Sequence, residues 1–480
     1  MEFLHDHAGE PGFEELVPMF RPQELLGAHA AAALLATVDE APPSPVTGAP
    51  VELVITTGDN VDNAQCNELA RYLTLFAGGR VVTGSGRDDR HDRHDRHDHH
   101  DRDAALRDHD GPQNGRNPRF YSPDTDDDRY ARRWGFPRAP GLIAAALRPF
   151  DVPGLRLPWL TAFGNHDGLL QGRAAFDPGT AAHTVGGRKA TALPPGPVAD
   201  IVTRPLELLT GPSRDIVPDP GRRPFTRAEY AAAHRDVGGA PHGHGFGASH
   251  DDDGPAAYVH DTEHVRIITL DTTNPGGYQH GSIGPRQLAW LEDRLREVHG
   301  RHLDVDGRWV RTSAQDRLVV ICSHHGTTTL TNTVDAAGPD EVDPDLPRLL
   351  ADALTAVLHR YPNVVAWLSG HVHRHQVRAH PGPTGGFWEI VTASVMEWPS
   401  QARSLDLVDN ADGTLSIVST LLDHDAPVRP AGTATVLELA AWHRELAVND
   451  PTSVAGSGAV GTPLDRNVEL LVPDPRADAV

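Results

Sequence analysis

The sequence predicts an α/β fold in which two β-sheets pack as a sandwich flanked by helices. Short apolar runs rich in β-branched residues alternate with helical patterns through much of the chain. Several short strands then follow one another over residues 376–420, as in an antiparallel sheet. The chain has 480 residues, 39% of them hydrophobic, which is enough to bury a core of this kind.

The elements can be assigned in order from these patterns. Pro22 suits the first turn of a helix, and the apolar run Val51–Thr57 ends at Gly58 as a buried strand should. The predicted helices cover residues 22–38, 64–76, 226–234, 286–298, 346–359 and 436–446. The predicted strands cover residues 51–57, 157–163, 257–260, 265–271, 318–323, 364–368, 376–379, 388–393, 404–408 and 414–420.

The chain divides into one large domain, an insertion and a tail. The domain is expected over residues 10–425, and a low-complexity insertion rich in His, Asp and Arg interrupts it at 84–133. This insertion has almost no apolar residues to bury, so no stable secondary structure is expected over 85–118. Residues 426–480 should form a last helix and a tail rich in Pro, Gly and Asp.

Charge and composition exclude several classes of partner. Acidic residues outnumber Lys plus Arg by 66 to 43, and this excess disfavours binding to nucleic acid or to anionic lipid. Cys66 and Cys322 are too few for a disulfide framework. No apolar run approaches the roughly 18 residues of a membrane span, and residues 1–20 lack a signal-peptide pattern. The chain as it stands is expected in the cytoplasm, with export as the alternative if a signal precedes Met1.

Four short segments carry metal-ligand residues, and each follows a predicted strand. Carboxylate, amide and imidazole groups together suit divalent Mn, Fe or Zn. Taken alone, each segment is weak evidence, because Gly-Asp is a common turn and a buried His is often a core residue. The order of all four along the chain is the specific signal. The segments are Gly58-Asp59-Asn60-Val61-Asp62, Gly164-Asn165-His166-Asp167, Ser323-His324-His325 and Gly370-His371-Val372-His373.

With these segments the chain resembles the calcineurin-like metallophosphoesterase superfamily. The blocks at 270–274 and 388–403 look like an actinobacterial branch with long insertions. The resemblance implies a hydrolase with two divalent ions, Mn, Fe or Zn, and a small-molecule phosphoester substrate. It also implies roles for single residues. Asp59 would bridge both ions, and Asn165, His324 and His371 would complete the coordination of one of them. His373 would bind the other ion. His166 would contact the phosphate or protonate the leaving group, and Asp167 would orient His166.

The chain departs from the superfamily at its start. Members begin with a strand ending in Asp-x-His, which pairs beside the strand matching Val51–Thr57 and supplies two ligands to one ion. The nearest candidate here is His5-Asp6-His7, which has the wrong spacing and too few residues before it. We therefore expect the first strand to be absent through N-terminal truncation, with lower solubility and a weakened second metal site.

The sequence predicts a metal-dependent phosphoester hydrolase that uses a two-metal-activated hydroxide. One alternative is a truncated protein of this fold with impaired catalysis, and another is a metal-sequestering protein that uses the His-rich tract. A nuclease would share the chemistry, but the sequence has no evident basic groove. The identity of the metal, the substrate within the phosphoesters and the oligomeric state are left open.

Overall fold

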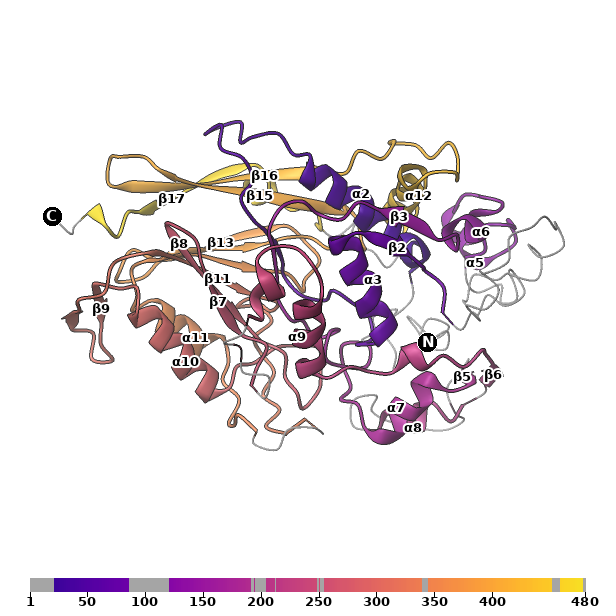
Figure 1. The fold of residues 1–480 in the computed structure, drawn as a ribbon, viewed down its shortest axis with the longest axis horizontal. Helices are drawn as coiled ribbons and strands as arrows, with labels where there is room; N and C mark the ends of the chain where they lie inside the picture. Colours follow the sequence, from indigo (N-terminus) through magenta and orange to yellow (C-terminus); the bar gives the residue numbers. More distant parts are fainter. Residues whose placement is uncertain are drawn as a thin grey trace.

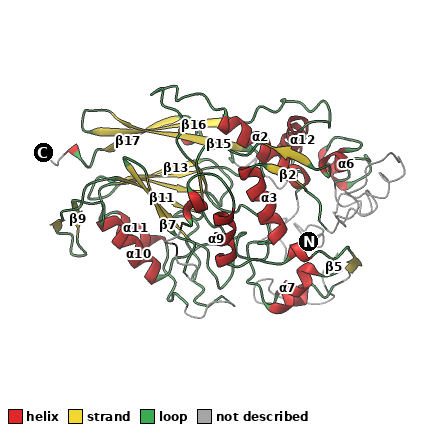
Figure 2. Ribbon diagram, viewed as in Figure 1, coloured by secondary structure: helices red, strands yellow, loops and turns green. Residues whose placement is uncertain are grey.

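The computed structural model describes residues 21–85, 121–190, 194, 204–211, 213–247, 250, 254–338, 344–450 and 458–477. Over these residues the chain is a mixed α/β structure with a six-stranded sheet, smaller sheets and helices (Figures 1 and 2). The α/β class predicted from the sequence is therefore confirmed. No stable secondary structure was expected over residues 85–118. Of these, only residue 85 is among the described residues.

The six-stranded sheet has a parallel centre and antiparallel edges. Its order is β13-β14-β12-β11-β8-β7, and neighbours pair in parallel from β14 through β8. Parallel pairing brings the carboxyl ends of the central strands to one edge. The strands are β7 (Tyr258–Asp261), β8 (Val265–Leu270), β11 (Leu318–Ser323), β12 (Val364–Ser369), β13 (Gln376–His380) and β14 (Phe387–Val391).

The two faces of this sheet pack against different partners. On β11, Val319 and Ile321 join a hydrophobic cluster with helices α10 (Pro285–Arg296) and α11 (Ala351–Leu358). Leu318, on the other face of β11, joins a cluster with residues of a three-stranded antiparallel sheet. Figure 1 shows this second sheet on one side of the six-stranded sheet and the two helices on the other. The second sheet has the order β15 (Gln401–Asp409), β16 (Thr414–Asp423) and β17 (Val468–Pro473).

A separate pair of parallel strands carries the first two metal-ligand segments. Strand β1 (Val54–Thr56) pairs with β4 (Trp159–Thr161). No described strand pairs with the other edge of β1. The helices that share hydrophobic contacts in this part of the molecule are α2 (Gly27–Asp39), α3 (Cys66–Ala77), α9 (Arg227–Asp236) and α12 (Val436–Asn449).

Several elements were not predicted from the sequence. Strand β17 lies in the tail that its Pro, Gly and Asp residues predicted to be irregular. Helix α11 begins at Ala351 and not at residue 346, because the backbone of Leu349 pairs with Ile283. The remaining short elements are η1 (Glu24–Leu26), β2 (Gly79–Val81), α5 (Arg129–Trp134), α6 (Leu142–Ala146), β3 (Phe150–Val152), α7 (Pro178–Val185), β5 (Arg188–Ala190), α8 (Pro205–Leu208), β6 (Ser213–Asp215), η3 (Pro220–Arg222), η4 (His242–Gly245), β9 (Arg301–Leu303), β10 (Trp309–Arg311) and η6 (Pro463–Asp465).

Within the described part of the chain, no helix is long and apolar enough to cross a membrane.

A buried histidine in α9 predicts how the fold responds to acid. His234 is fully buried, and its ring lies 4.3 Å from that of Tyr230 and 5.8 Å from that of Trp159. Burial lowers the pKa of His234 to about 3. Between this value and the ordinary pKa near 6.5, the unfolded chain binds a proton that the folded chain does not. Stability should therefore fall as the pH drops below about 6.5.

We predict that His234→Phe reduces this acid sensitivity. Between pH 6.5 and 5 the variant should lose about 2 kcal/mol less free energy of unfolding than the unmodified chain. Urea denaturation at several pH values measures this difference. The control is His264→Phe, because the side chain of His264 is 75% exposed. Equal acid sensitivity of the unmodified chain and His234→Phe would contradict the prediction.

Candidate metal centre

Side chains from the loops after four strands converge on one cluster. His324, after β11, places Nε2 3.0 Å from Oδ2 of Asp59 and 3.1 Å from Nδ1 of His371. The same Nδ1 of His371 lies 3.1 Å from Oδ1 of Asn165. Asp59 follows β1, Asn165 follows β4 and His371 follows β12. One carboxylate, one amide oxygen and two imidazoles thus face a common point.

Hydrogen bonds to backbone carbonyls outside the cluster orient its ligand atoms. Nδ1 of His324 donates to the carbonyl of Thr57 at 2.7 Å, which leaves Nε2 to face the cluster. Nδ2 of Asn165 donates to the carbonyl of Gly172 at 3.0 Å, which turns Oδ1 inward. Metal-binding side chains in proteins are usually held by such outer hydrogen bonds. The donor set and its orientation therefore fit a divalent ion.

The loops reach this arrangement through strained backbone and close contacts. Asp59, His371 and His373 have φ angles of 56°, 65° and 52°, in the left-handed region that side chains rarely adopt. A Cβ atom on Gly164 would lie 2.2 Å from Oδ1 of Asp59, so only glycine fits there. Strain of this kind is often found at functional sites, where the surrounding structure maintains it.

The charges within the cluster are strongly coupled. Burial alone would raise the pKa of Asp59, but the imidazoles, His324 foremost, hold it well below its usual range. Burial opposes protonation of His324, yet the neighbouring Asp59 raises its pKa. Burial, together with nearby His325 and His324, holds the pKa of His371 well below its usual value. His371 is thus a neutral imidazole near neutral pH, the form that binds metals.

His373, predicted to bind a second ion, has a different set of contacts. Its Nδ1 lies 3.0 Å from Oε1 of Glu397, whose side chain is only 4% exposed. Glu397 is also paired with Arg21 at 2.5 Å. Burial would raise the pKa of Glu397, but Arg21 and His373 lower it to about 2. Neither Glu397 nor Arg21 was predicted as a site residue: both lie outside the four segments, although Glu397 lies within the block at 388–403.

His325 lies in the same group but is already hydrogen-bonded at both ring nitrogens. Three ring nitrogens, one from each of His324, His325 and His371, lie within 4.8 Å of one another, a spacing that could hold a metal ion. Nδ1 of His325, however, lies 2.9 Å from the Thr272 hydroxyl, and Nε2 lies 2.9 Å from the carbonyl of Gln279. Both nitrogens would have to leave their partners before binding metal, so Asp59 and Asn165 are the better companions for His324 and His371.

His166 and Asp167 differ from the expected pairing. Asp167 is fully buried and accepts hydrogen bonds from the backbone N–H groups of Asn60 and Gly164 at 2.9 and 2.8 Å. These bonds connect the loop after β1 with the loop after β4, and none of them involves the His166 ring. Nδ1 of His166 instead lies 2.7 Å from the carbonyl of Asp62 and 3.4 Å from its carboxylate.

The acid–base state of His166 follows from its neighbours. Burial would lower the pKa of His166, but Asp59 and Asp62 raise it to about 9. The imidazole is therefore protonated at neutral pH. Asp62 belongs to the first segment, but no local pattern predicts its contact with this ring.

Comparisons with known proteins add little to this geometry. No family model matches the chain, and no curated protein matches it. Among solved structures, the chain is similar to a dimetal phosphatase from Danio rerio, with 12% sequence identity and a TM-score of 0.22. The alignment covers 36% of this chain and 61% of that one. A match at this TM-score does not support assignment to a family.

We predict that Gly164→Ala weakens metal binding, because the added methyl group would displace the Asp59 carboxylate. Affinity for Mn²⁺ or Zn²⁺, measured by titration calorimetry, should fall by about 10–100-fold, the range seen when the surroundings of metal ligands are disturbed. Gly238→Ala is a matched control, since nothing lies within 4 Å of the Cβ position there. If Gly164→Ala bound as tightly as the control, Asp59 would not be a ligand.

Proposed function

We propose that the chain is a metal-dependent phosphoester hydrolase of the metallophosphoesterase type, with two layers of sheet supporting the site. The observation that carries the proposal is the convergence of Asp59, Asn165, His324 and His371 from four strand ends. A bound divalent ion would lower the pKa of a coordinated water and polarise the phosphoryl oxygens. These four residues would hold the first ion.

His373 and Glu397 would serve the second ion. Nδ1 of His373 lies 3.0 Å from Oε1 of Glu397. In one arrangement His373 would bind the ion and Glu397 would orient its ring, and in the other both side chains would be ligands. Arg21 keeps the Glu397 carboxylate ionised. Asp59 is the proposed shared ligand of the two ions. Its Oδ2 lies 3.0 Å from Nε2 of His324, and the hydrogen bond that Oδ1 accepts from the backbone N–H of His166 would orient the carboxylate.

His166 is the proposed general acid. Its raised pKa, about 9, keeps a proton on the ring at neutral pH. Because Nδ1 is engaged by Asp62, Nε2 is the atom that would donate to the departing alkoxide oxygen. His166 lines the same cavity as Asp59 and His371, as a group that acts on a metal-bound substrate must.

The substrate class is proposed from charge. The net charge of −23 opposes nonspecific binding of nucleic acid, which favours a small phosphoester. The His-rich tract behind the metal-sequestration alternative lies mostly outside the described residues, so no observation here favours that alternative.

We predict Mn²⁺-dependent hydrolysis of bis(p-nitrophenyl) phosphate by the 480-residue chain. His371→Ala should lose both metal binding and activity. His166→Ala should keep metal binding but lose about 10²–10⁴-fold in kcat, the usual contribution of a general acid. His264→Ala, at an exposed position, should behave like the unmodified chain. Metal-dependent activity that survives in His371→Ala would exclude the proposed site.

A second variant tests the role of Glu397. Glu397→Gln should keep the affinity of the first ion, and should lower the affinity of the second ion or the activity by about 10–100-fold. Metal stoichiometry by mass spectrometry and steady-state kinetics provide the readouts. Glu389→Gln is the control, because Glu389 is equally buried but pairs with Arg378 and His380. Equal metal content and kcat in Glu397→Gln and the control would remove Glu397 from the site.

A further inference from the structure

A fifth loop reaches the metal centre, from strand β8. Strand β8 pairs in parallel with β11, so the loop that follows it lies at the same sheet edge as His324. In this loop the carbonyl of Gln279 accepts a hydrogen bond from Nε2 of His325 at 2.9 Å. The ring of His280 lies edge-on to that of His371, with 5.9 Å between the ring centroids. His280 thus lies beside a proposed metal ligand, although it belongs to none of the four metal-ligand segments.

The backbone that carries His280 is fixed by several hydrogen bonds. The side chain of Asn332, only 6% exposed, donates to the carbonyls of Gly277 and His280 at 2.8 and 2.9 Å. Gly281 donates its N–H to the carbonyl of Thr329 at 2.8 Å, and its carbonyl accepts from the N–H of Asn332 at 2.9 Å. These bonds join the loop after β8 to the loop after β11. His280 is therefore held in a defined position although its side chain is exposed.

One ring nitrogen of His280 orients the ring, and the other is left for a ligand. Nδ1 lies 2.8 Å from the hydroxyl oxygen of Thr331. Within the described residues, Nε2 has no hydrogen-bond partner. When the Thr331 hydroxyl donates to Nδ1, the neutral ring carries its proton on Nε2, and the imidazolium carries one there in any case. Nε2 can therefore donate a hydrogen bond to a bound molecule.

A positively charged side chain lies near His280. Burial and the Arg173 guanidinium both lower the pKa of His280, so the charge of Arg173 reaches that ring. Arg173 follows Gly172, whose carbonyl accepts from Nδ2 of Asn165 at 3.0 Å. The Arg173 carbonyl accepts from the N–H of Tyr278 at 2.6 Å, and this bond joins its loop to that of His280. Arg173 and His280 thus come from two adjoining loops on the Asn165 side of the centre.

The carboxylates of the centre contact side chains other than His280. Among the described residues, no carboxylate forms an ion pair with His280. The space beside this ring therefore favours an anion more than the opposite side of the centre does. The contacts of the carboxylates are Asp59 with His324, Asp62 with His166 and Gln171, and Glu397 with His373 and Arg21.

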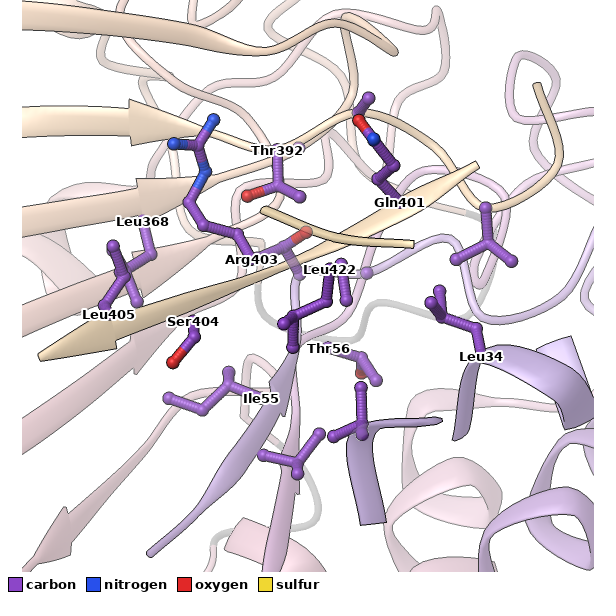
Figure 3. Close-up of a pocket in the computed structure, with 18 of the residues that line it drawn as sticks. Leu34, Ile55, Thr56, Leu368, Thr392, Gln401, Arg403, Ser404, Leu405 and Leu422 are labelled. Carbon is purple, nitrogen blue, oxygen red and sulfur yellow. The ribbon is translucent and has the colours of Figure 1, made fainter. Parts of the chain in front are cut away.

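The cavity that contains the centre changes in character from one part to another. Figure 3 shows a part where Leu34, Ile55 and Leu405 are among the lining residues. Around His280 the lining is polar, and a charged phosphoester would find hydrogen-bond donors there and not at the leucines. The polar lining residues around His280 are Gln171, Arg173, Gln279 and Thr329.

We propose that Nε2 of His280 donates a hydrogen bond to a phosphoryl oxygen of the substrate, which makes His280 a substrate-binding residue. The inference rests on the proposed function, because it needs a phosphoester bound at the first ion. The four proposed ligands of that ion leave open positions in its shell, which a phosphoryl oxygen would fill. A further oxygen of the same group would accept from His280, whose ring adjoins that of His371. His166 would act on the leaving oxygen, and His280 would hold an oxygen that stays on phosphorus.

Binding of methylphosphonate tests this role without turnover. Methylphosphonate has phosphoryl oxygens but no ester bond to hydrolyse, and titration calorimetry on the Mn²⁺-loaded 480-residue chain measures its affinity. His280→Ala should lower this affinity by about 10–100-fold, the usual range for a lost hydrogen bond to a charged group. His280→Gln should recover part of the loss, since its side-chain amide N–H can take the place of the Nε2 donor.

The matched control is His242→Ala, because His242 is exposed and does not line the cavity. This variant should bind methylphosphonate like the unmodified chain. Manganese content, measured by mass spectrometry, should be equal in all variants, since His280 is not a proposed metal ligand. A loss of manganese in His280→Ala would show that the ring only supports His371, and would overturn the proposal.

Three further results overturn the proposal. They are a Mn²⁺-loaded chain that does not bind methylphosphonate, a His280→Ala variant that binds as tightly as His242→Ala, and a His280→Gln variant that binds no better than His280→Ala. A chain that binds methylphosphonate through His280 but hydrolyses no phosphoester contradicts the proposed function alone. A chain that hydrolyses bis(p-nitrophenyl) phosphate while His280→Ala keeps full affinity for methylphosphonate contradicts this inference alone.

Discussion

The hydrogen bond from Nδ1 of His324 to the carbonyl of Thr57 connects the two halves of the metal centre. His324 directly follows β11 of the six-stranded sheet, and Thr57 directly follows β1 of the separate pair, so this 2.7 Å bond connects two sheets. It fixes the tautomer of His324 and turns Nε2 towards Asp59. Because Thr57 is two residues before Asp59, the same bond positions the carboxylate and the imidazole that face each other.

Around this connection the centre contains charges that are stable only as a group. The Asp59 carboxylate lies 3.0 Å from Nε2 of His324 and raises the pKa of that imidazole, while burial, His325 and His324 hold the pKa of His371 well below its usual value. A bound divalent ion would supply positive charge facing the Asp59 carboxylate. The left-handed backbone at Asp59 and His371 adds strain that the buried surroundings must support. The surroundings therefore hold these ligand residues in place, at a cost to the stability of the loops.

The sequence predicted much of the framework because its signals are local. Apolar runs such as Val364–Leu368 predict buried strands, and residues directly after parallel strands must lie at the same sheet edge. Asp59 and His371 follow strands of different sheets, so only the order of the segments along the chain predicted one site for them. In the structure both lie beside His324. The chain order of the segments carried the information.

The rest depended on contacts that no local pattern records. Glu397 reaches His373 from the segment between β14 and β15, and Arg21 reaches Glu397 from the other end of the chain. Asp62, rather than Asp167, contacts the His166 ring, because the buried Asp167 carboxylate is used to bind backbone N–H groups of two loops. Strand β17 pairs with β16 and has the apolar residues Val468, Leu470 and Val472, but the Pro, Gly and Asp residues around it in the tail predicted irregular structure.

Strands β1 and β15 show a different limit of sequence reasoning. The residues of β1 and β15 read as ordinary strands, yet each has one edge without a described strand partner. Which edge is open depends on the sheet order, and the sheet order is a property of the whole fold. Residues of both strands line the cavity that also contains Asp59 and His371.

The central claim, that Asp59, Asn165, His324 and His371 hold a metal ion, is tested most directly by anomalous X-ray diffraction from crystals grown with Mn²⁺. The account predicts a peak about 2.0–2.3 Å from Nε2 of His324 and from Oδ2 of Asp59, with Asn165 and His371 completing the shell. The absence of a peak at this position, or a peak bound by His325 in place of Asp59, would contradict it.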